Sequence, residues 1–487
     1  MGSYLVSSCL ERIFSYLLEE EEELQCKESK TKNYKLINLY SCTLVSRYWC
    51  KISTPVLYSY PFHNFRNISY GVNVPLFIFT YKFYNYYKLI RTLLKCIPRS
   101  EINKGKVYNE QKLTSPPTFN YISFIRGLIV DKLLFEPQEV CIYYKETWLS
   151  DNYDPERITT ESAIQMMNQF VKFLFNNCNN LEILEFPYFP KFNVFNNVIT
   201  SLISTNNNGN NKIAKLREFH FKNHSNLKPI SQILSTISKN SYNIKFLYNE
   251  DINNSYVANH LSHLISKQNN LRYLILSKSI NRLDSPNLPN VENIEDCIFK
   301  SLYIQRDSLK VLELKNFCFA NMDQNALNSL SMLENLSELK LINCSYIMAI
   351  KSNLIYWAKN LTKLETMEFK PAIISNPETQ QTELDIPEDF LIRLFESSSR
   401  TLTKLVLEYE YDQNIKITRN IHLLLRSLAY LVIPETYELN SILHSCHKLV
   451  YVLILTNNIN KPKYSEFYRS SVDEPFVKSK FPYFNYY

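Results

Sequence analysis

The chain has 487 residues, of which 45% are hydrophobic, 14% aromatic and 21% charged. Such a composition supports a large core and excludes a wholly disordered chain. Only five residues are glycine, about 1% of the chain where average usage is near 7%, and these five are widely separated. Phosphate-binding loops, dinucleotide fingerprints and nucleophile elbows need closely spaced glycines. The sequence therefore excludes these three kinds of enzyme site.

The net charge is +7, from 54 basic and 47 acidic residues, and no block of lysine and arginine concentrates it. We therefore expect no nucleic-acid partner, because nucleic-acid binders gather basic residues on one face. The 11 cysteines form no Cys-x-x-Cys pair, which favours a reducing compartment, cytoplasmic or nuclear. Glu11 and Arg12 interrupt what would be the apolar part of a signal peptide, and no apolar run reaches membrane-spanning length. We expect no membrane partner.

The first sixty residues predict a small helical module. Leu10, Ile13, Phe14 and Leu17 follow the spacing of an amphipathic helix. Residues 19 to 23 are five glutamates, and the polar stretch 25 to 33 behind them predicts a solvated loop. Apolar residues return from Tyr34 and suit one or two further helices that end near Pro55. Such a short module has a marginal core and normally needs a partner.

Residues 5 to 60 resemble an F-box. The resemblance rests on the stretches 9 to 17 (CLERIFSYL), 39 to 52 (LYSCTLVSRYWCKI) and 55 to 58 (PVLY). F-boxes dock three helices onto the Skp-type adaptor of a cullin-based SCF ubiquitin ligase, so the resemblance implies these partners. It implies nine residues as adaptor contacts or supporting core, without separating the two roles: Leu5, Cys9, Leu10, Ile13, Phe14, Leu17, Leu44, Val45 and Trp49.

Residues 61 to 120 form an aromatic-rich connecting region. Its stretch 81 to 87 (YKFYNYY) precedes a predicted helix over 88 to 97. Aromatic side chains next to lysine are able to stack nucleic-acid bases, but a stacking platform also needs a basic groove. Burial against the neighbouring domain is the interpretation that we prefer.

A pattern of three apolar residues, Leu-x-x-Leu-x-Leu, recurs between residues 121 and 456. Clear copies begin at Leu181, Leu216, Leu271, Leu309, Leu336, Leu402, Leu428 and Leu449, and weaker ones at Ile125, Ile244 and Leu361. Several steps between copies lie in or near the range of leucine-rich repeats, about 20 to 29 residues. Six of the intervening segments have helical periodicity: 163 to 175, 198 to 203, 230 to 237, 257 to 265, 354 to 357 and 390 to 395.

The predicted fold class is α/β: a short N-terminal three-helix F-box (1 to 60), followed by an irregular leucine-rich-repeat solenoid (121 to 456) with a parallel concave sheet. Each repeat is too small to bury its apolar edge alone, so neighbouring repeats must stack. A doubly wound α/β domain also alternates strands and helices, but it would want glycine at its tight turns. Residues 457 to 487 are a C-terminal tail or cap.

The residues between the buried leucines should face solvent on the concave sheet and bind a target protein. The predicted target-binding residues are Glu218, His220, Lys222, Tyr273, Val311, Glu313, Lys315, Glu338, Lys340, Lys404, Glu408, Tyr430 and Tyr451. Their charges alternate in sign, which favours a protein partner over phosphate or lipid.

No enzyme site is predicted. Nucleophile, base and oxyanion donor cannot be assembled, and no cofactor is expected. The strongest histidine cluster, His444 with Cys446 and His447, does not supply the four converging ligands of a zinc site, so no metal is expected either. The sequence thus predicts a non-catalytic substrate receptor of a ubiquitin ligase. The alternative is a leucine-rich-repeat scaffold without a ligase role.

Overall fold

The computed structural model describes residues 6–25, 33–69, 76–98, 117–131, 134, 145–148, 159–187, 211–222, 227–252, 254–278, 294–319, 322–371, 388–408, 425, 427–434, 442–444, 446–456, 463–468 and 477–478. The chain forms two compact units, Met1–Ser241 and Tyr242–Tyr487. Each unit is α/β, and we describe each by itself.

The first unit begins with three helices that pack on one another: α1 (Ser7–Gln25), α2 (Asn33–Val45) and α3 (Arg47–Leu57). Helix α1 continues through the run of glutamates. Helix α3 starts at Ser46, whose hydroxyl accepts a hydrogen bond from the Trp49 backbone N–H at 3.1 Å. It was expected to end near Pro55 and ends two residues later, at Leu57, where Val56 and Leu57 pack against the helical core.

Next along the chain come η1 (His63–Phe65), α4 (Arg66–Ser69) and α5 (Leu76–Leu94). Helix α5 begins well before the predicted 88 to 97, and it includes the aromatic stretch. Tyr86 and Tyr87 in that stretch are fully buried, and the Tyr86 hydroxyl lies 3.0 Å from both carboxylate oxygens of Asp131. The prediction of burial is met only in part, because Tyr81 and Tyr84 of the same stretch are exposed.

The first unit also contains the parallel strands β1 (Gly127–Ile129), β2 (Ile183–Phe186) and β3 (Glu218–Lys222). The register places the predicted repeat residues Leu128, Leu184 and Phe219 side by side, and all three are fully buried. Its remaining elements are η2 (Tyr121–Phe124), α9 (Lys145–Trp148), α10 (Thr160–Asn177) and α12 (Leu227–Asn240). The predicted helix over 198 to 203 lies outside the described residues.

The second unit alternates parallel strands with helices. The strands are β4 (Phe246–Ile252), β5 (Tyr273–Lys278), β6 (Val311–Lys315), β7 (Glu338–Cys344), β8 (Thr366–Pro371), β9 (Lys404–Leu407), β10 (Tyr430–Pro434) and β11 (Tyr451–Thr456). They pair in chain order, β4 with β5 and so on to β11. Strands β12 (Lys463–Tyr468) and β13 (Val477–Lys478) then continue the sheet in antiparallel orientation.

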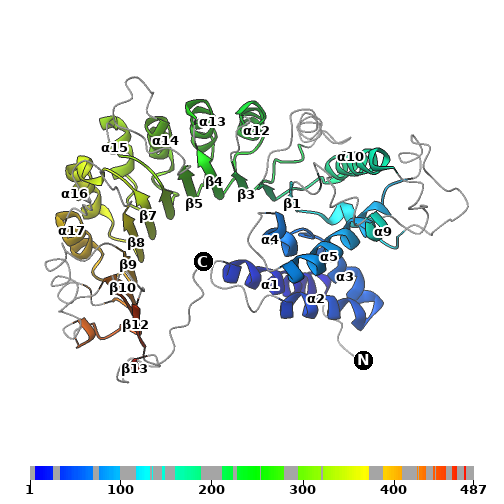
Figure 1. Cartoon of the computed structure of the whole chain (residues 1–487), viewed down its shortest axis with the longest axis horizontal. Helices are drawn as coiled ribbons and strands as arrows, with labels where there is room; N and C mark the ends of the chain where they lie inside the picture. Colours follow the sequence, from blue (N-terminus) through cyan, green and yellow to red (C-terminus); the bar gives the residue numbers. More distant parts are fainter. Residues whose placement is uncertain are drawn as a thin grey trace, which may run out of the picture. The chain divides into compact units, whose positions relative to one another are not determined.

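The helices between these strands lie along one face of the sheet (Figure 1). They are α13 (Ser255–Ser266), α14 (Ile294–Leu302), η3 (Tyr303–Gln305), α15 (Gln324–Ser331), η4 (Ile347–Ile350), α16 (Lys351–Asn360) and α17 (Glu388–Ser398). We call the opposite face, on which the structure describes no helix, the helix-free face. It corresponds to the predicted concave sheet. Helices α14 and α15 were not among the predicted helical segments.

Strand register confirms the repeat pattern and corrects one copy. Leu274, Leu312 and Leu339 align across neighbouring strands and are fully buried. The copy predicted at Leu361 is displaced by three residues, because Met367 rather than Leu364 pairs with Leu339. The repeat therefore starts at Leu364. Leu361 is also fully buried, which is why the sequence pattern fitted both phases.

Asparagine and aspartate stand where the scarce glycines would be expected. Asp251, Asn316 and Asn343 have φ values of 69°, 60° and 53° and lie near the ends of β4, β6 and β7; strand register makes Asn316 and Asn343 equivalent, whereas Asp251 lies in a register shift of β4. Short polar side chains tolerate this left-handed conformation better than other non-glycine residues. The strand-end turns of these repeats are therefore built without glycine.

Among the described residues, no helix combines the length and the hydrophobicity needed to cross a lipid bilayer.

Candidate functional site

The N-terminal helices divide the predicted adaptor-binding residues into core and surface. Leu10 and Phe14 are buried together with Leu39 and Ile52, and Trp49 packs edge-on against Phe14 with ring centroids 5.5 Å apart. The surface group is Cys9, Ile13, Leu44 and Val45, and three of these are large apolar side chains with 46%, 69% and 62% exposure. Leu5 and the side chain of Leu17 lie outside the described residues.

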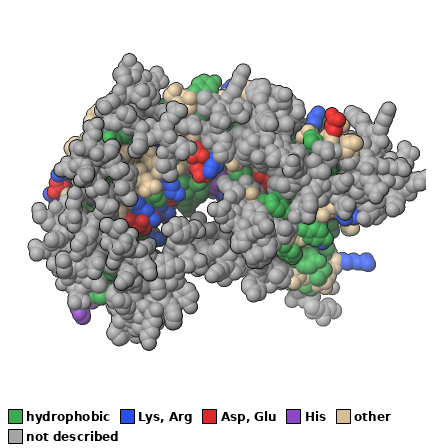
Figure 2. All heavy atoms as spheres, in the orientation of Figure 1, with side chains coloured by type: hydrophobic (Ala, Val, Ile, Leu, Met, Phe, Trp, Pro, Cys, Tyr) green, Lys and Arg blue, Asp and Glu red, His purple; other side chains and the backbone are tan. Residues whose placement is uncertain are grey.

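Four further large apolar residues at these helices are exposed and were missed from the sequence: Val6, Tyr16, Tyr40 and Tyr48. Val6, Cys9, Ile13 and Tyr16 are spaced three, four and three residues apart, which places them on one side of α1. That spacing could have identified Val6 and Tyr16. We call the exposed residues Val6, Cys9, Ile13, Tyr16, Tyr40, Leu44, Val45 and Tyr48 the apolar surface of the N-terminal helices. Figure 2 shows hydrophobic side chains at the surface in this region.

The segment after α3 joins these helices to the first strand. The Ser59 carbonyl accepts hydrogen bonds from the backbone N–H groups of Arg126 and Gly127, at 2.8 and 3.0 Å. The same pattern, in which one carbonyl accepts hydrogen bonds from two consecutive N–H groups, recurs between later strands. For example, the Arg126 carbonyl accepts the N–H groups of Glu182 and Ile183. Gly127 is required here, because a Cβ at this position would overlap the Tyr60 ring. The segment therefore caps the edge of β1.

A buried ionic cluster fastens the same segment to β2 and β3. The Glu185 carboxylate, with no exposed surface, lies 2.9 Å from Arg66 Nε and 3.2 Å from His63 Nε2. Arg66 Nη2 also lies 3.3 Å from His220 Nδ1. Burial alone would raise the pKa of Glu185, but His220, His63 and Arg66 outweigh it and hold the pKa well below its usual range.

The predicted residues of the first unit are thus only partly available to a target. His220 was expected to face solvent, yet it is buried in the cluster with Glu185. Its neighbour Glu218, half-buried, lies 3.6 Å away from His220 Nε2. Lys222 is half-buried at the end of β3.

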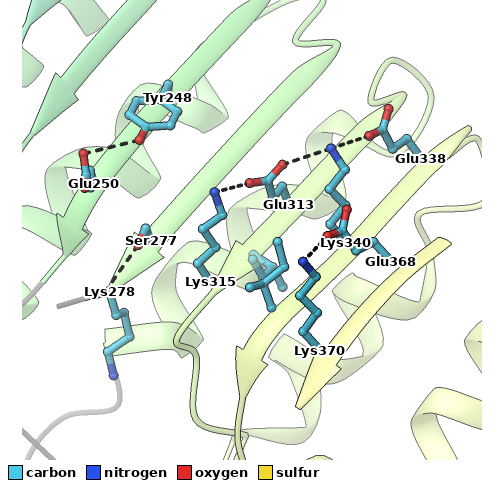
Figure 3. Close-up of polar contacts among 12 residues, drawn as sticks. Tyr248, Glu250, Ser277, Lys278, Glu313, Lys315, Glu338, Lys340, Glu368 and Lys370 are labelled. Carbon is cyan, nitrogen blue, oxygen red and sulfur yellow. Dashed lines mark hydrogen bonds and ion pairs between the residues drawn. The ribbon is translucent and has the colours of Figure 1, made fainter. Parts of the chain in front are cut away.

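On the helix-free face of the second unit, charged side chains form a row of alternating sign on β6, β7 and β8 (Figure 3), and Glu408, directly after β9, extends it. Lys315 Nζ lies 2.6 Å from Glu313, whose other carboxylate oxygen lies 3.4 Å from Lys340 Nζ. Further contacts of 2.6 to 3.1 Å join Lys340 to Glu338, and Lys370 to Glu368 and Glu408. We call Glu313, Lys315, Glu338, Lys340, Glu368, Lys370 and Glu408 the ion row.

The ion row is partly desolvated. Burial would lower the pKa of Lys340, but Glu313 and Glu338 outweigh it and raise the pKa. Burial would likewise lower the pKa of Lys370, but Glu408 and Glu368 outweigh it and raise the pKa. Glu313 was expected to be solvent-exposed, but it is buried between its two lysines. The row is thus a preorganised polar surface rather than a set of freely moving charges.

Aromatic pairs flank the ion row on the same face. Phe246 and Tyr273 stack across β4 and β5 with centroids 5.8 Å apart, and Tyr273 is 42% exposed. At the other end, Tyr430 and Tyr451 stack at 4.5 Å, and Lys404 Nζ lies 5.0 Å from the Tyr430 ring centroid. Val311, half-buried, follows Tyr273 in the same cross-strand row. The structure thus groups the second unit's predicted residues on one surface.

No metal centre emerges from the described residues, where no group of three or more His, Cys, Asp or Glu side chains is placed to hold an ion. In the strongest cluster predicted from the sequence, Cys446 is buried while His444 and His447 are exposed. Burial raises the pKa of the Cys446 thiol to about 11, which disfavours a thiolate ligand.

A scan against protein-family models gives no match to this chain, and a search of curated proteins gives no significant relative. The functional interpretation therefore depends on the surfaces described above.

Proposed function

We propose that this protein is the substrate-recognition subunit of an SCF-type ubiquitin ligase. In this proposal the N-terminal helices bind a Skp-type adaptor, and through it the cullin, while the strand and helix repeats bind a target protein. The chain itself contributes no chemistry. It acts in the cytoplasm or the nucleus.

The observation that carries the proposal is the apolar surface of the N-terminal helices. A three-helix module with Leu10, Phe14, Leu39 and Ile52 in its core still leaves Ile13, Leu44 and Val45 largely exposed. Exposed apolar patches on soluble proteins mark interaction sites. Together with the F-box resemblance of the same residues, this surface favours an adaptor as the partner.

The junction with the repeats supports the same function. Ser59, Glu185 and Arg66 fix the helical module to the first strands through hydrogen bonds and a buried ion pair. A receptor that carries its adaptor-binding and target-binding surfaces on one chain raises the effective concentration of the target near the ubiquitin carrier. No group on this chain has to react for that effect.

The test uses substitutions confined to the exposed surface. Ile13→Asp combined with Leu44→Asp places two charges in the proposed contact without entering the core. We expect this variant to lose at least ~90% of its pull-down by a purified Skp-type adaptor, as expected for charges placed in an apolar contact. Phe14 is left intact, because it is 1% exposed and its substitution would unfold the module.

The matched control is Tyr256→Asp combined with Tyr356→Asp, on α13 and α16. These side chains are 53% and 52% exposed and lie outside the N-terminal helices. Adaptor binding should be unchanged in this control. Failure of the unmodified chain to bind the adaptor would leave the repeat scaffold without a ligase role as the better description.

A further inference from the structure

The strand-entry edge of the second unit carries cations beside the aromatic row. Lys245, Arg272 and Lys310 directly precede β4, β5 and β6, and each is followed by an apolar residue: Phe246, Tyr273 and Val311. We call these six residues the basic and apolar edge. Lys245 and Arg272 are exposed, and Lys310 is half-buried.

The backbone holds the three cations in equivalent places. The Lys245 carbonyl accepts the N–H groups of Arg272 and Tyr273, and the Arg272 carbonyl accepts those of Lys310 and Val311. Because neighbouring strands lie about 4.8 Å apart, the three side chains start from points that span on the order of 10 Å. Two of these side chains make long polar contacts: Arg272 Nε lies 3.4 Å from the Asn270 side-chain oxygen, and Lys310 Nζ lies 3.4 Å from the Asn335 carbonyl.

The run of basic and apolar residues stops after β6. In the cross-strand row that contains Phe246, Tyr273 and Val311, the next residue is Glu338. The position equivalent to Lys310 becomes Ser337 before β7 and Glu365 before β8. Within the second unit, the basic character is therefore confined to the residues that precede β4, β5 and β6, which suits a short ligand segment.

We propose that the basic and apolar edge binds an acidic peptide segment of the target protein. Its carboxylates would pair with Lys245, Arg272 and Lys310, and its apolar side chains would pack on Phe246, Tyr273 and Val311. This inference rests on the proposed function, since it names the chemistry of the target that the repeats recognise.

Charge favours a peptide over a nucleic acid. A phosphate chain gains affinity from many consecutive cations, whereas this edge offers only three, and the acidic Glu338 directly follows Val311 in the cross-strand row. A short acidic segment needs only the three, and its apolar residues use the stacked Phe246 and Tyr273 rings. Apolar anchors in such an aromatic patch supply affinity, while the charges supply selectivity.

The test measures fluorescence anisotropy with the full chain and three labelled probes. The first is a short peptide of Asp and Glu interspersed with Phe and Leu, the second has Lys at every acidic position, and the third is single-stranded oligothymidine. We expect saturable binding of the acidic peptide alone, weakened by added salt. Equal or tighter binding of the basic peptide or of oligothymidine would overturn the inference, as would no binding of the acidic peptide.

Two matched double variants locate the contact. Lys245→Glu with Arg272→Glu should weaken acidic-peptide binding by about tenfold or more, because two attractive charges become repulsive. Lys172→Glu with Lys359→Glu reverses two exposed lysines on α10 and α16 and should change it by less than about twofold. Equal effects of the two variants would refute the assignment of the site.

Adaptor pull-down with the Lys245→Glu and Arg272→Glu variant separates this inference from the proposed function. We expect adaptor binding to be retained, since these residues lie outside the N-terminal helices. If the chain binds the acidic peptide but no adaptor, the peptide site stands and the ligase role fails. If it binds the adaptor but not the peptide, the ligase role stands and this inference fails.

Discussion

Each unit has a buried glutamate that pairs with basic side chains, Glu185 on β2 and Glu313 on β6, at equivalent strand positions. The two ion pairs serve different purposes. In the first unit, Glu185 is completely buried under Arg66 and His63, which come from a segment far away in the sequence. In the second, Glu313 contacts Lys315 of its own strand and Lys340 of the next strand. The first arrangement covers the sheet and fixes the N-terminal helices. The second leaves several charged ends, such as Lys315 and Glu408, partly exposed to a partner.

Among the substitutions that test this comparison, we expect Glu185→Gln to cause the largest loss of stability. Removing one partner of a buried ion pair leaves the other charge uncompensated, so we expect a loss of about 3 kcal/mol in the free energy of unfolding. The measurement is urea denaturation at neutral pH. A loss no greater than that of Glu313→Gln would contradict the distinction between the two units.

The same variant gives a pH test with a definite sign. The folded-state pKa of Glu185 lies below its usual value, so its contribution to stability is present above the unfolded pKa, about 4.3. That contribution is lost as the pH falls toward the folded pKa. The stability difference between the wild type and Glu185→Gln should therefore shrink below about pH 4. A difference that grows on acidification would show the opposite linkage.

Gly127→Ala should have the next largest effect. The new Cβ would overlap the Tyr60 ring and push the capping segment away from β1, with an expected loss of about 2 kcal/mol, typical of overpacking. Thermal unfolding measures it. The double variant with Tyr60→Ala is the control: it should recover part of the loss, because the overlap is gone. Strict additivity of the two substitutions would rule out this contact.

Asn249→Leu should act in the opposite direction. Asn249 is fully buried and pairs across the strands with Leu276, at a repeat position where other copies have leucine, phenylalanine or isoleucine, and neither side-chain amide atom has a hydrogen-bond partner. Relieving two unsatisfied polar atoms should stabilise the second unit by about 1 to 2 kcal/mol. The exposed Asn269→Leu serves as a control with an expected change below about 0.5 kcal/mol. A destabilised Asn249→Leu would mean that the amide has a role that the packing does not reveal.

The smallest expected effect is that of Glu313→Gln, about 1 kcal/mol of destabilisation, since Lys315 and Lys340 remain partly hydrated after the change. Salt sharpens the comparison with Glu185→Gln. Raising the salt concentration should reduce the Glu313→Gln effect, because salt screens partly exposed charges more than buried ones. If salt reduced the stability loss of Glu185→Gln as much as that of Glu313→Gln, the proposed difference in burial between the two ion pairs would be wrong.

The sequence predicted the strands better than the sites, for physical reasons. Leu312 and Leu339 are spaced by the repeat itself, so apolar periodicity located the strands that bury them. Glu185 was not identified, because its partners Arg66 and His63 lie more than a hundred residues earlier in the chain. His220 was expected in solvent for the same reason. Apolar periodicity distinguishes the two faces of a strand, but it does not indicate which distant segment of the chain covers one of those faces.

For the N-terminal helices, the division between core and surface needed coordinates. The spacing of Leu10, Ile13 and Phe14 placed all three on one helix stripe, whereas the packing of α2 and α3 buries Leu10 and Phe14 and leaves Ile13 out. The exposed stripe through Val6, Cys9 and Ile13 has a spacing that the sequence displays. Its exposure follows from how α2 and α3 pack on α1, which the sequence does not display.

The most direct measurement of the central claim is hydrogen–deuterium exchange on the full chain with and without a purified Skp-type adaptor. We predict that the adaptor slows exchange in peptides from α1 and from the end of α2 into α3, where Ile13, Leu44 and Val45 are exposed. Exchange in β4 to β9 should not change. No protection at the N-terminal helices, or protection confined to the strands, would contradict the account.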